Sequence, residues 1–252
     1  MSYFNYNNKR CHYTSMGSGE PLVLLHGNTA SSAMFADVVQ YYTNHFEVYL
    51  IDFLGHGLSD RVERFATDLW YDEAKQVVAF LEQTKLSKVN IVGSSGGALV
   101  ALNVALERPY LVYAIIADSF EGEEPLEAFV KNVIQERELS KQDPATIAFY
   151  KANQGENWKT VVDNDTRAVY EHYRSIGKFF HKPLESLQVS VLLTGSKQDE
   201  FITDDFFERT FSKLLAKIPN GTMHLFEQGG HPAILSNGEA FAKVSREFFR
   251  KS

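Results

Sequence analysis

Short apolar runs alternate with longer stretches of helical periodicity along most of the chain. The runs are nearly continuous in apolar residues, as strands buried on both faces of a sheet are. They lie at residues 21–26, 48–52, 88–93, 113–118, 189–195 and 222–227. Because strands that alternate with helices are typical of parallel sheets, the pattern predicts an α/β fold with a mostly parallel, doubly wound sheet of about eight strands.

Helical patterns between these runs supply the layers that would cover the sheet. Residues 68–84 place apolar side chains at helical spacing, and residues 98–107 continue as an apolar helix directly after a glycine cluster. The alternation is weaker near the N-terminus, where residues 3–6 and 10–16 are predicted to form an antiparallel hairpin at the edge of the sheet.

A long stretch without a strand pattern interrupts this order. Residues 121–182 contain two or three successive helical patterns and many aromatic side chains. We therefore expect an α/β core at residues 1–120 and 183–252, with a helical cap inserted at 121–182. Most of the cap aromatics are expected to pack the cap onto the core, and a minority to line a pocket.

Composition narrows the class of protein. Of the 252 residues, 44% are hydrophobic and 23% charged, which is enough apolar material for one large core. A formal net charge of −7 and a pI near 5.6 leave no basic face for phosphates, which argues against nucleic-acid binding. Without a signal-peptide pattern or an apolar run of about 18 residues, we expect a cytoplasmic protein with no membrane contact. The single cysteine, Cys11, is expected to be structural.

A G-x-S-x-G motif follows the apolar run at residues 88–93 and leads into a helical stretch. Its defined positions are Gly93, Ser95 and Gly97. The motif presents a serine on a sharp strand-to-helix turn, where glycines two residues before and after it relieve crowding. Ser95 is the candidate nucleophile in preference to Ser94, because only Ser95 has glycine at both positions.

A serine hydroxyl needs an imidazole to take its proton. Gly229 and Gly230 follow the last apolar run and allow a loop to fold back over the carboxyl edge of the sheet, which brings His231 toward the serine. His231 is therefore the candidate general base. None of the histidines at positions 12, 45, 172, 181 and 224 lies in a glycine-containing loop after an apolar run.

The imidazole in turn needs a carboxylate to hold its tautomer. Asp199 lies in the loop after residues 189–195 and is the favoured acid. Two alternatives remain open: Glu200 beside it, and Asp118 at the end of the run 113–118.

An oxyanion that forms on an attacked carbonyl needs prepositioned N–H donors. The backbone N–H groups of Asn28, in the loop after the first parallel strand, and of Gly96, directly after the nucleophile, are the candidate donors. His26 in the same loop is interpreted as a loop-stabilising residue and not as a second base.

Five segments resemble, in order, the motifs of the α/β-hydrolase fold superfamily. They are His26-Gly27, the D-x-x-G-x-G-x-S segment from Asp52 to Ser59, the G-x-S-x-G segment, the acid loop from Gly195 to Asp199, and Gly230-His231-Pro232. The resemblance covers nearly the whole chain and implies this fold with the order Ser…Asp…His. In that family the Asp52 segment forms a structural turn, so neither Asp52 nor His56 is assigned a catalytic role.

Two features depart from or extend this resemblance. The acid commonly follows the glycine by three residues, whereas Asp199 follows Gly195 by four. The turn formed by His26, Gly27 and Asn28 also resembles that of the haloalkane dehalogenases, whose nucleophile is an aspartate. With serine at position 95, that chemistry is not expected in its usual form.

These residues predict a serine hydrolase that cleaves a small carboxylic ester through an acyl-enzyme. A lactonase, a carbon–carbon bond hydrolase, an aminopeptidase or a non-catalytic ligand-binding member of the fold would share the same residues, so these alternatives stay open. No dinucleotide-binding or metal-ligand motif occurs, and we expect neither a cofactor nor a metal. The expected partner is a small-molecule ester, and the chain is expected to be a monomer or homodimer.

Overall fold

Eight strands of the described chain pair into one sheet, in the order β1-β2-β4-β3-β5-β6-β7-β8. The structure is a computed structural model that describes residues 2–203 and 205–252. The strands are β1 (Ser2–Tyr6), β2 (Lys9–Gly17), β3 (Glu20–Leu25), β4 (Phe46–Ile51), β5 (Val89–Ser94), β6 (Val112–Asp118), β7 (Ser190–Ser196) and β8 (Gly221–Phe226). β1 and β2 pair antiparallel at one edge, and β3 to β8 are parallel. The predicted fold class is confirmed, including the N-terminal hairpin.

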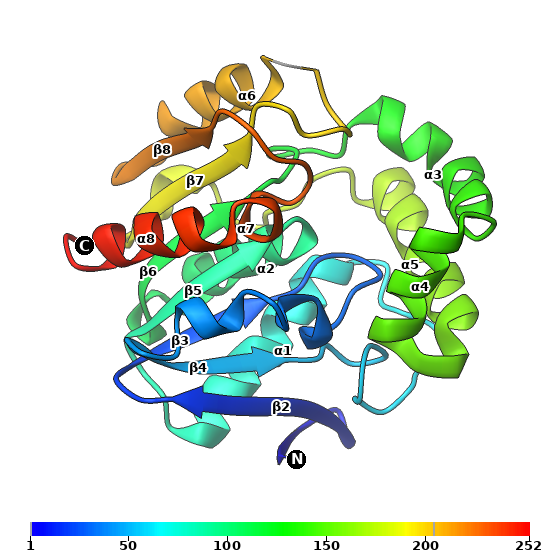
Figure 1. The fold of residues 1–252 in the computed structure, drawn as a ribbon, viewed down its shortest axis with the longest axis horizontal. Coiled ribbons are helices and arrows are strands. Elements are labelled where there is room, and N and C mark those ends of the chain that lie inside the picture. Colours follow the sequence, from blue (N-terminus) through cyan, green and yellow to red (C-terminus); the bar gives the residue numbers. More distant parts are fainter. Residues whose placement is uncertain (1, 204) are drawn as a thin grey trace.

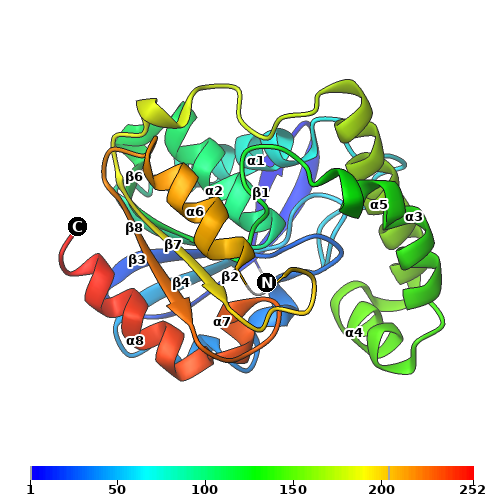
Figure 2. The same cartoon turned by 90° about the horizontal axis from the view of Figure 1, so that it is seen from above.

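Helices cover both faces of this sheet, with α1, α2 and α6 on one face and α8 on the other (Figures 1 and 2). Their bounds are α1 (Leu69–Thr84), α2 (Gly96–Glu107), α6 (Phe206–Leu215), α7 (Ala233–Ser236) and α8 (Gly238–Phe249). Within residues 2–203 and 205–252, every helix is too short or too polar to cross a bilayer.

Strand β3 shows how the sheet divides its side chains between two cores. Val23 and Leu25 pack with α1 and α2, whereas Leu22 and Leu24 pack on the opposite face with Phe241 of α8. Successive side chains of a strand point to opposite faces, so a strand between two helical layers is apolar throughout. Each fully buried side chain of this kind contributes roughly 1.5–3 kcal/mol. The continuous apolar runs of the sequence therefore reflect two covered faces.

Three helices connect β6 to β7 and lie beyond the carboxyl ends of the parallel strands (Figures 1 and 2). They are α3 (Glu127–Ser140), α4 (Pro144–Gln154) and α5 (Trp158–Ser175). Trp158 stacks on Tyr150 with 5.5 Å between ring centroids, and both side chains are buried. We refer to these three helices as the cap; its treatment as a separate unit at residues 121–182 stays a prediction.

Candidate active site

Ser95 occupies a sharp turn between β5 and α2. Its φ of 55° lies in the left-handed region, and backbone held this way stores about 1–3 kcal/mol of strain. A Cβ on Gly93 would lie 2.1 Å from the carbonyl oxygen of Gly97, and a Cβ on Gly97 would lie 2.3 Å from that of Leu25. Only glycine fits at these two positions. Helix α2 accordingly begins at Gly96, two residues before the start expected from periodicity.

His231 lies between Ser95 and Asp199. Its Nε2 is 3.1 Å from Ser95 Oγ, and its Nδ1 is 2.7 Å from Asp199 Oδ2. Asp199 is 3% exposed, so water competes little for its carboxylate. With Nδ1–H donating to that carboxylate, the Nε2 lone pair faces the serine hydroxyl and can accept its proton.

The loop that carries Asp199 also holds His231 from other directions. The second oxygen of Asp199 accepts a hydrogen bond from the backbone N–H of Phe201 at 3.0 Å. Glu200, one alternative acid, accepts from the backbone N–H of His231 at 2.9 Å and does not contact the ring through a hydrogen bond in the described chain. Phe201 packs edge-on against the imidazole, with 5.1 Å between ring centroids. Glu200 thus supports the loop while Asp199 supports the ring.

Asp118, the other alternative acid, forms its hydrogen bonds with groups other than the His231 ring. Its Oδ1 accepts hydrogen bonds from the hydroxyls of Thr194 (2.9 Å) and Ser119 (3.1 Å), and its Oδ2 accepts from the backbone N–H of Ile234 (3.1 Å). Burial raises the pKa of this carboxyl to about 7, although these hydrogen bonds lower it. Because its oxygens face these donors and not the imidazole, Asp118 supports the segment that follows His231.

The candidate oxyanion donors lie beside the nucleophile. A Cβ on Gly27 would lie 3.0 Å from Ser95 Cβ, so the loop after β3 passes directly over the serine. A Cβ on Gly96 would lie 2.1 Å from Asn28 Oδ1, so the Asn28 side chain covers the start of α2. The backbone N–H groups of Asn28 and Gly96 have no acceptor within residues 2–203 and 205–252. Unpaired donors beside a nucleophile are suited to stabilising a developing oxyanion.

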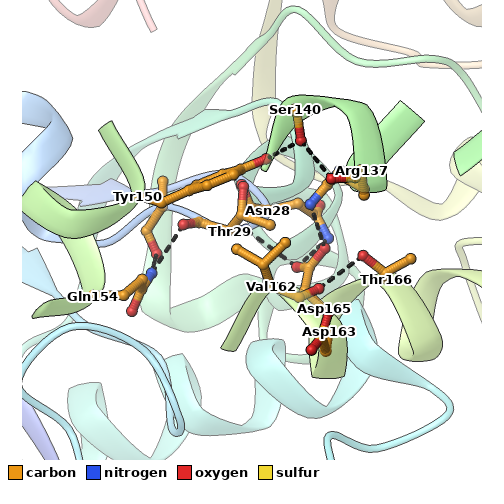
Figure 3. A network of polar contacts seen from close by, with 12 residues as sticks. Asn28, Thr29, Arg137, Ser140, Tyr150, Gln154, Val162, Asp163, Asp165 and Thr166 are labelled. Atoms are coloured by element: carbon orange, nitrogen blue, oxygen red, sulfur yellow. Dashed lines mark hydrogen bonds and ion pairs between the residues drawn. The ribbon is translucent and has the colours of Figure 1, made fainter. Parts of the chain in front are cut away.

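Buried polar side chains around this loop were missed by the sequence reasoning. The amide of Asn28 accepts from Trp70 Nε1 at 3.1 Å and donates to Asp165 of α5 at 2.9 Å. Gln154 of α4 donates to the carbonyls of Thr29 (2.9 Å) and Ala30 (2.7 Å). Figure 3 shows these cap side chains converging on the loop.

One signal for these contacts was present in the sequence. Asp165 stands four residues after Val161 and four before Val169, in the middle of the buried stripe of α5. A carboxylate within an apolar stripe indicates a specific polar partner, because an unpaired buried charge is costly. The pattern did not indicate which partner.

His26 and Asp52, two residues of the sequence motifs, form hydrogen bonds within and between loops. His26 Nδ1 lies 2.9 Å from the carbonyl oxygen of Gly27, its Nε2 accepts from the backbone N–H of Phe53 at 3.2 Å, and burial lowers its pKa. Asp52 accepts from the backbone N–H groups of Leu58 and Ser32, which ties its turn to the segment after Asn28. These contacts agree with loop-stabilising roles.

The chain is similar to known proteins along nearly its whole length. The sequence profile of the alpha/beta hydrolase family matches residues 22–244. The (E)-2-((N-methylformamido)methylene)succinate hydrolase of Acinetobacter baylyi is 33% identical over 106 residues, which are 42% of this chain and 40% of that protein. The match therefore spans less than half of that relative's length.

Two further similarities extend over nearly complete chains. The pimeloyl-[acyl-carrier protein] methyl ester esterase of Vibrio campbellii is 26% identical over 258 residues, covering 94% of this chain and 97% of that protein. The solved structure of an esterase from Exiguobacterium antarcticum superposes with a TM-score of 0.80 at 19% identity and covers 99% of both chains. The structural similarity shows a shared fold.

Proposed function

Because the chain belongs to the alpha/beta hydrolase family, we propose that it is a serine hydrolase that cleaves small carboxylic esters through an acyl-enzyme. One observation carries the proposal: two successive hydrogen bonds link Ser95 Oγ to His231 and His231 to the buried Asp199. The three residues supply a nucleophile, a base and an orienting carboxylate in the mutual geometry that acyl transfer requires.

In the proposed reaction, Ser95 Oγ attacks the ester carbonyl while His231 Nε2 takes the hydroxyl proton. The negative charge that forms on the carbonyl oxygen is stabilised by the N–H groups of Asn28 and Gly96. Collapse of the tetrahedral intermediate breaks the bond to the leaving alkoxide, which receives the proton from His231. Water, deprotonated by the same imidazole, then attacks the acyl-enzyme carbonyl. Collapse of this second tetrahedral intermediate breaks the bond to Ser95 Oγ, which takes the proton back from His231 as the acid departs.

The position of the cap supports a small substrate. Helices α3 to α5 lie beyond the carboxyl ends of β5 and β7, the strands that precede Ser95 and Asp199 (Figures 1 and 2). A lid of this kind encloses small molecules and hinders access of a polymer. We therefore propose short, uncharged or weakly hydrophobic acyl groups as preferred substrates, with lactones, carbon–carbon bonds and N-terminal peptides as the alternatives to be tested.

Covalent labelling tests the nucleophile directly. Intact-mass analysis after exposure to a fluorophosphonate should show one phosphonyl adduct on the wild-type protein and on Ser94→Ala, and none on Ser95→Ala. Unlabelled wild-type protein would show that Ser95 is not an activated nucleophile.

A substrate panel tests the reaction class. p-Nitrophenyl esters of increasing acyl length, a γ-lactone, a vinylogous diketone and a proline anilide should be compared by kcat/KM. The short esters are expected to be fastest. A rate that rises steadily with chain length, or a clear preference for one of the other classes, would overturn the ester proposal while leaving the nucleophile intact.

A further inference from the structure

A carboxylate from the cap reaches the loop that follows β3. We propose that Asp165, on α5, is a positioning residue that sets the orientation of Asn28 and so of its oxyanion-binding N–H, a step that rests on the proposed function. The cap would then take part in the reaction through this contact, in addition to enclosing the substrate.

Asp165 is fully buried and meets three donors. Its Oδ2 accepts from Asn28 Nδ2 at 2.9 Å and from the backbone N–H of Thr29 at 3.2 Å, and its Oδ1 accepts from Arg137 Nη1 at 3.2 Å (Figure 3). Burial raises the pKa of Asp165, and Arg137 and the two loop donors act in the opposite direction. The hydrogen bonds thus join one buried carboxylate to both the side chain and the following peptide of Asn28.

The far end of the Asn28 amide is fixed as well. Its Oδ1 accepts from Trp70 Nε1 at 3.1 Å. The same oxygen would lie only 2.1 Å from a Cβ on Gly96. Since the side chain is held at both ends and the Thr29 N–H is bound to Asp165, the torsions of residue 28 have little freedom. Its own backbone N–H is the donor left without an acceptor in the described chain.

The cap stays attached to this loop by contacts that do not involve Asp165. Gln154 Nε2 donates to the Ala30 carbonyl at 2.7 Å, and Asn153 Oδ1 accepts from the backbone N–H of Ser31 at 2.9 Å. Loss of the Asp165 carboxylate should therefore release Asn28 without releasing the cap. This separates a positioning role from general docking.

The test compares Asp165→Asn with Asp163→Asn, a matched change on the same helix at a side chain that is 52% exposed. We expect Asp165→Asn to lower kcat for p-nitrophenyl acetate by on the order of a hundredfold with KM unchanged, because a displacement of about 1 Å can cost this much. Affinity for a trifluoromethyl ketone, whose serine adduct carries an oxyanion, should fall in parallel. Asp163→Asn should leave all three values at the wild-type level.

A double variant shows whether Asp165 acts through Asn28. Asn28→Ala keeps the backbone N–H and removes both side-chain anchors, so it should also lower kcat with KM unchanged. Adding Asp165→Asn to Asn28→Ala should then cause little further loss, because residues that act through one contact are not additive.

Several outcomes would overturn the proposal. These are a folded Asp165→Asn with wild-type kcat, a loss confined to KM, or losses that multiply in the double variant. If Asp165→Asn shows no cooperative thermal unfolding, it is not folded and the test uses Asn28→Ala alone. A wild-type kcat in Asn28→Ala would refute the positioning role of Asp165. A wild-type protein that hydrolyses no ester and takes no fluorophosphonate would instead refute the proposed function, which distinguishes the two failures.

Discussion

On one side of Ser95, His231 and Asp199 stand on loops at the ends of β8 and β7, whereas on the other side Asn28 stands on the loop after β3 and is held by the cap. We call these the base side and the oxyanion side. The base side is supported by residues at the same strand ends. Glu200 binds the His231 backbone, and the buried Asp118 binds the backbone of the segment that follows. The oxyanion side is supported by α1 and α5, through partners 42 and 137 residues away in the chain.

The two sides should respond differently to substitutions, because different elements support them. The base side depends on strand ends, which also hold the core together, so its geometry is tied to the stability of the sheet. The oxyanion side depends on Trp70 of α1 and on Asp165 of the cap, whose three helices contribute no strand to the sheet. If the proposed roles hold, substitutions at the cap residues that bind Asn28 should change stabilisation of the oxyanion while His231 and Asp199 stay in place.

The largest effect is expected at the residue that both sides share. Ser95→Ala should lower kcat/KM for an activated ester by on the order of a millionfold, by analogy with other serine triads, with the fold intact by circular dichroism. Ser94→Ala is the control, since the buried Ser94 hydroxyl has no hydrogen-bond partner in the described chain. Substantial hydrolysis by Ser95→Ala would show that Ser95 is not the nucleophile, and the two sides could then no longer be compared around it.

The next effect isolates the base side. Asp199→Asn should lower kcat by roughly ten-thousandfold, because the imidazole loses the carboxylate that holds its tautomer and stabilises its charged form. Glu200→Gln should be much milder, since Glu200 binds the His231 backbone and not the ring. Steady-state kinetics of the two variants at one pH measures this. Equal losses would show that the loop as a whole, and not the Asp199 contact, supports the base.

A pair of glycines compares the two sides directly. Gly96→Ala should lower kcat by on the order of a hundredfold, because its Cβ would lie 2.1 Å from Asn28 Oδ1 and 2.8 Å from Trp70 Nε1, and displace the oxyanion side. Gly230→Ala is the matched change on the base side. The atom nearest to its Cβ would be Glu200 Oε2, at 2.6 Å, which is the far end of a flexible side chain and not backbone.

Kinetics with p-nitrophenyl acetate and a trifluoromethyl ketone would measure both glycine variants. Gly96→Ala should weaken the ketone in proportion to kcat, and Gly230→Ala should change either value little. If Gly230→Ala were the more damaging variant, the comparison of the two sides would be wrong.

The sheet and the base side could be predicted from sequence for local reasons. Burial on both faces makes β3 and β5 mostly apolar, and crowding at the turn requires glycine at positions 93 and 97. Each constraint leaves a pattern that can be read within a few consecutive residues, although the atom nearest to a Cβ on Gly97 belongs to Leu25. Ser95, His231 and Asp199 lie at such positions, and the structure places them within hydrogen-bonding distance.

The support of the oxyanion side could not be predicted because its constraints are not local. The bonds of Asn28 to Trp70 and Asp165 join segments whose meeting depends on where the cap settles. The alternatives for the acid failed to separate for a related reason. Asp118 ends β6 and Asp199 follows β7, so the sequence gives both a similar setting. The structure separates them, because Asp199 faces the His231 ring whereas Asp118 accepts from Thr194 and Ile234.

The smallest effect on turnover is expected at Asp118, where a pH-dependent change in stability sharpens the description of the base side. Burial raises the pKa of this carboxyl from 3.8 to about 7 in the folded protein. Between about pH 4 and pH 7 the folded state therefore binds more protons at this site than the unfolded state does, so the free energy of unfolding falls as pH rises.

Asp118→Asn removes that dependence. The variant's free energy of unfolding relative to wild type should rise across this window, by up to roughly 4 kcal/mol, and stay level above pH 7. Urea unfolding of both proteins from pH 4 to pH 8 measures the difference, and ester hydrolysis at pH 8 shows whether kcat is retained. Parallel stability curves would mean that Asp118 stays ionised beneath the His231 segment, and a loss of kcat as large as that of Asp199→Asn would mean that the acid has been assigned to the wrong strand end.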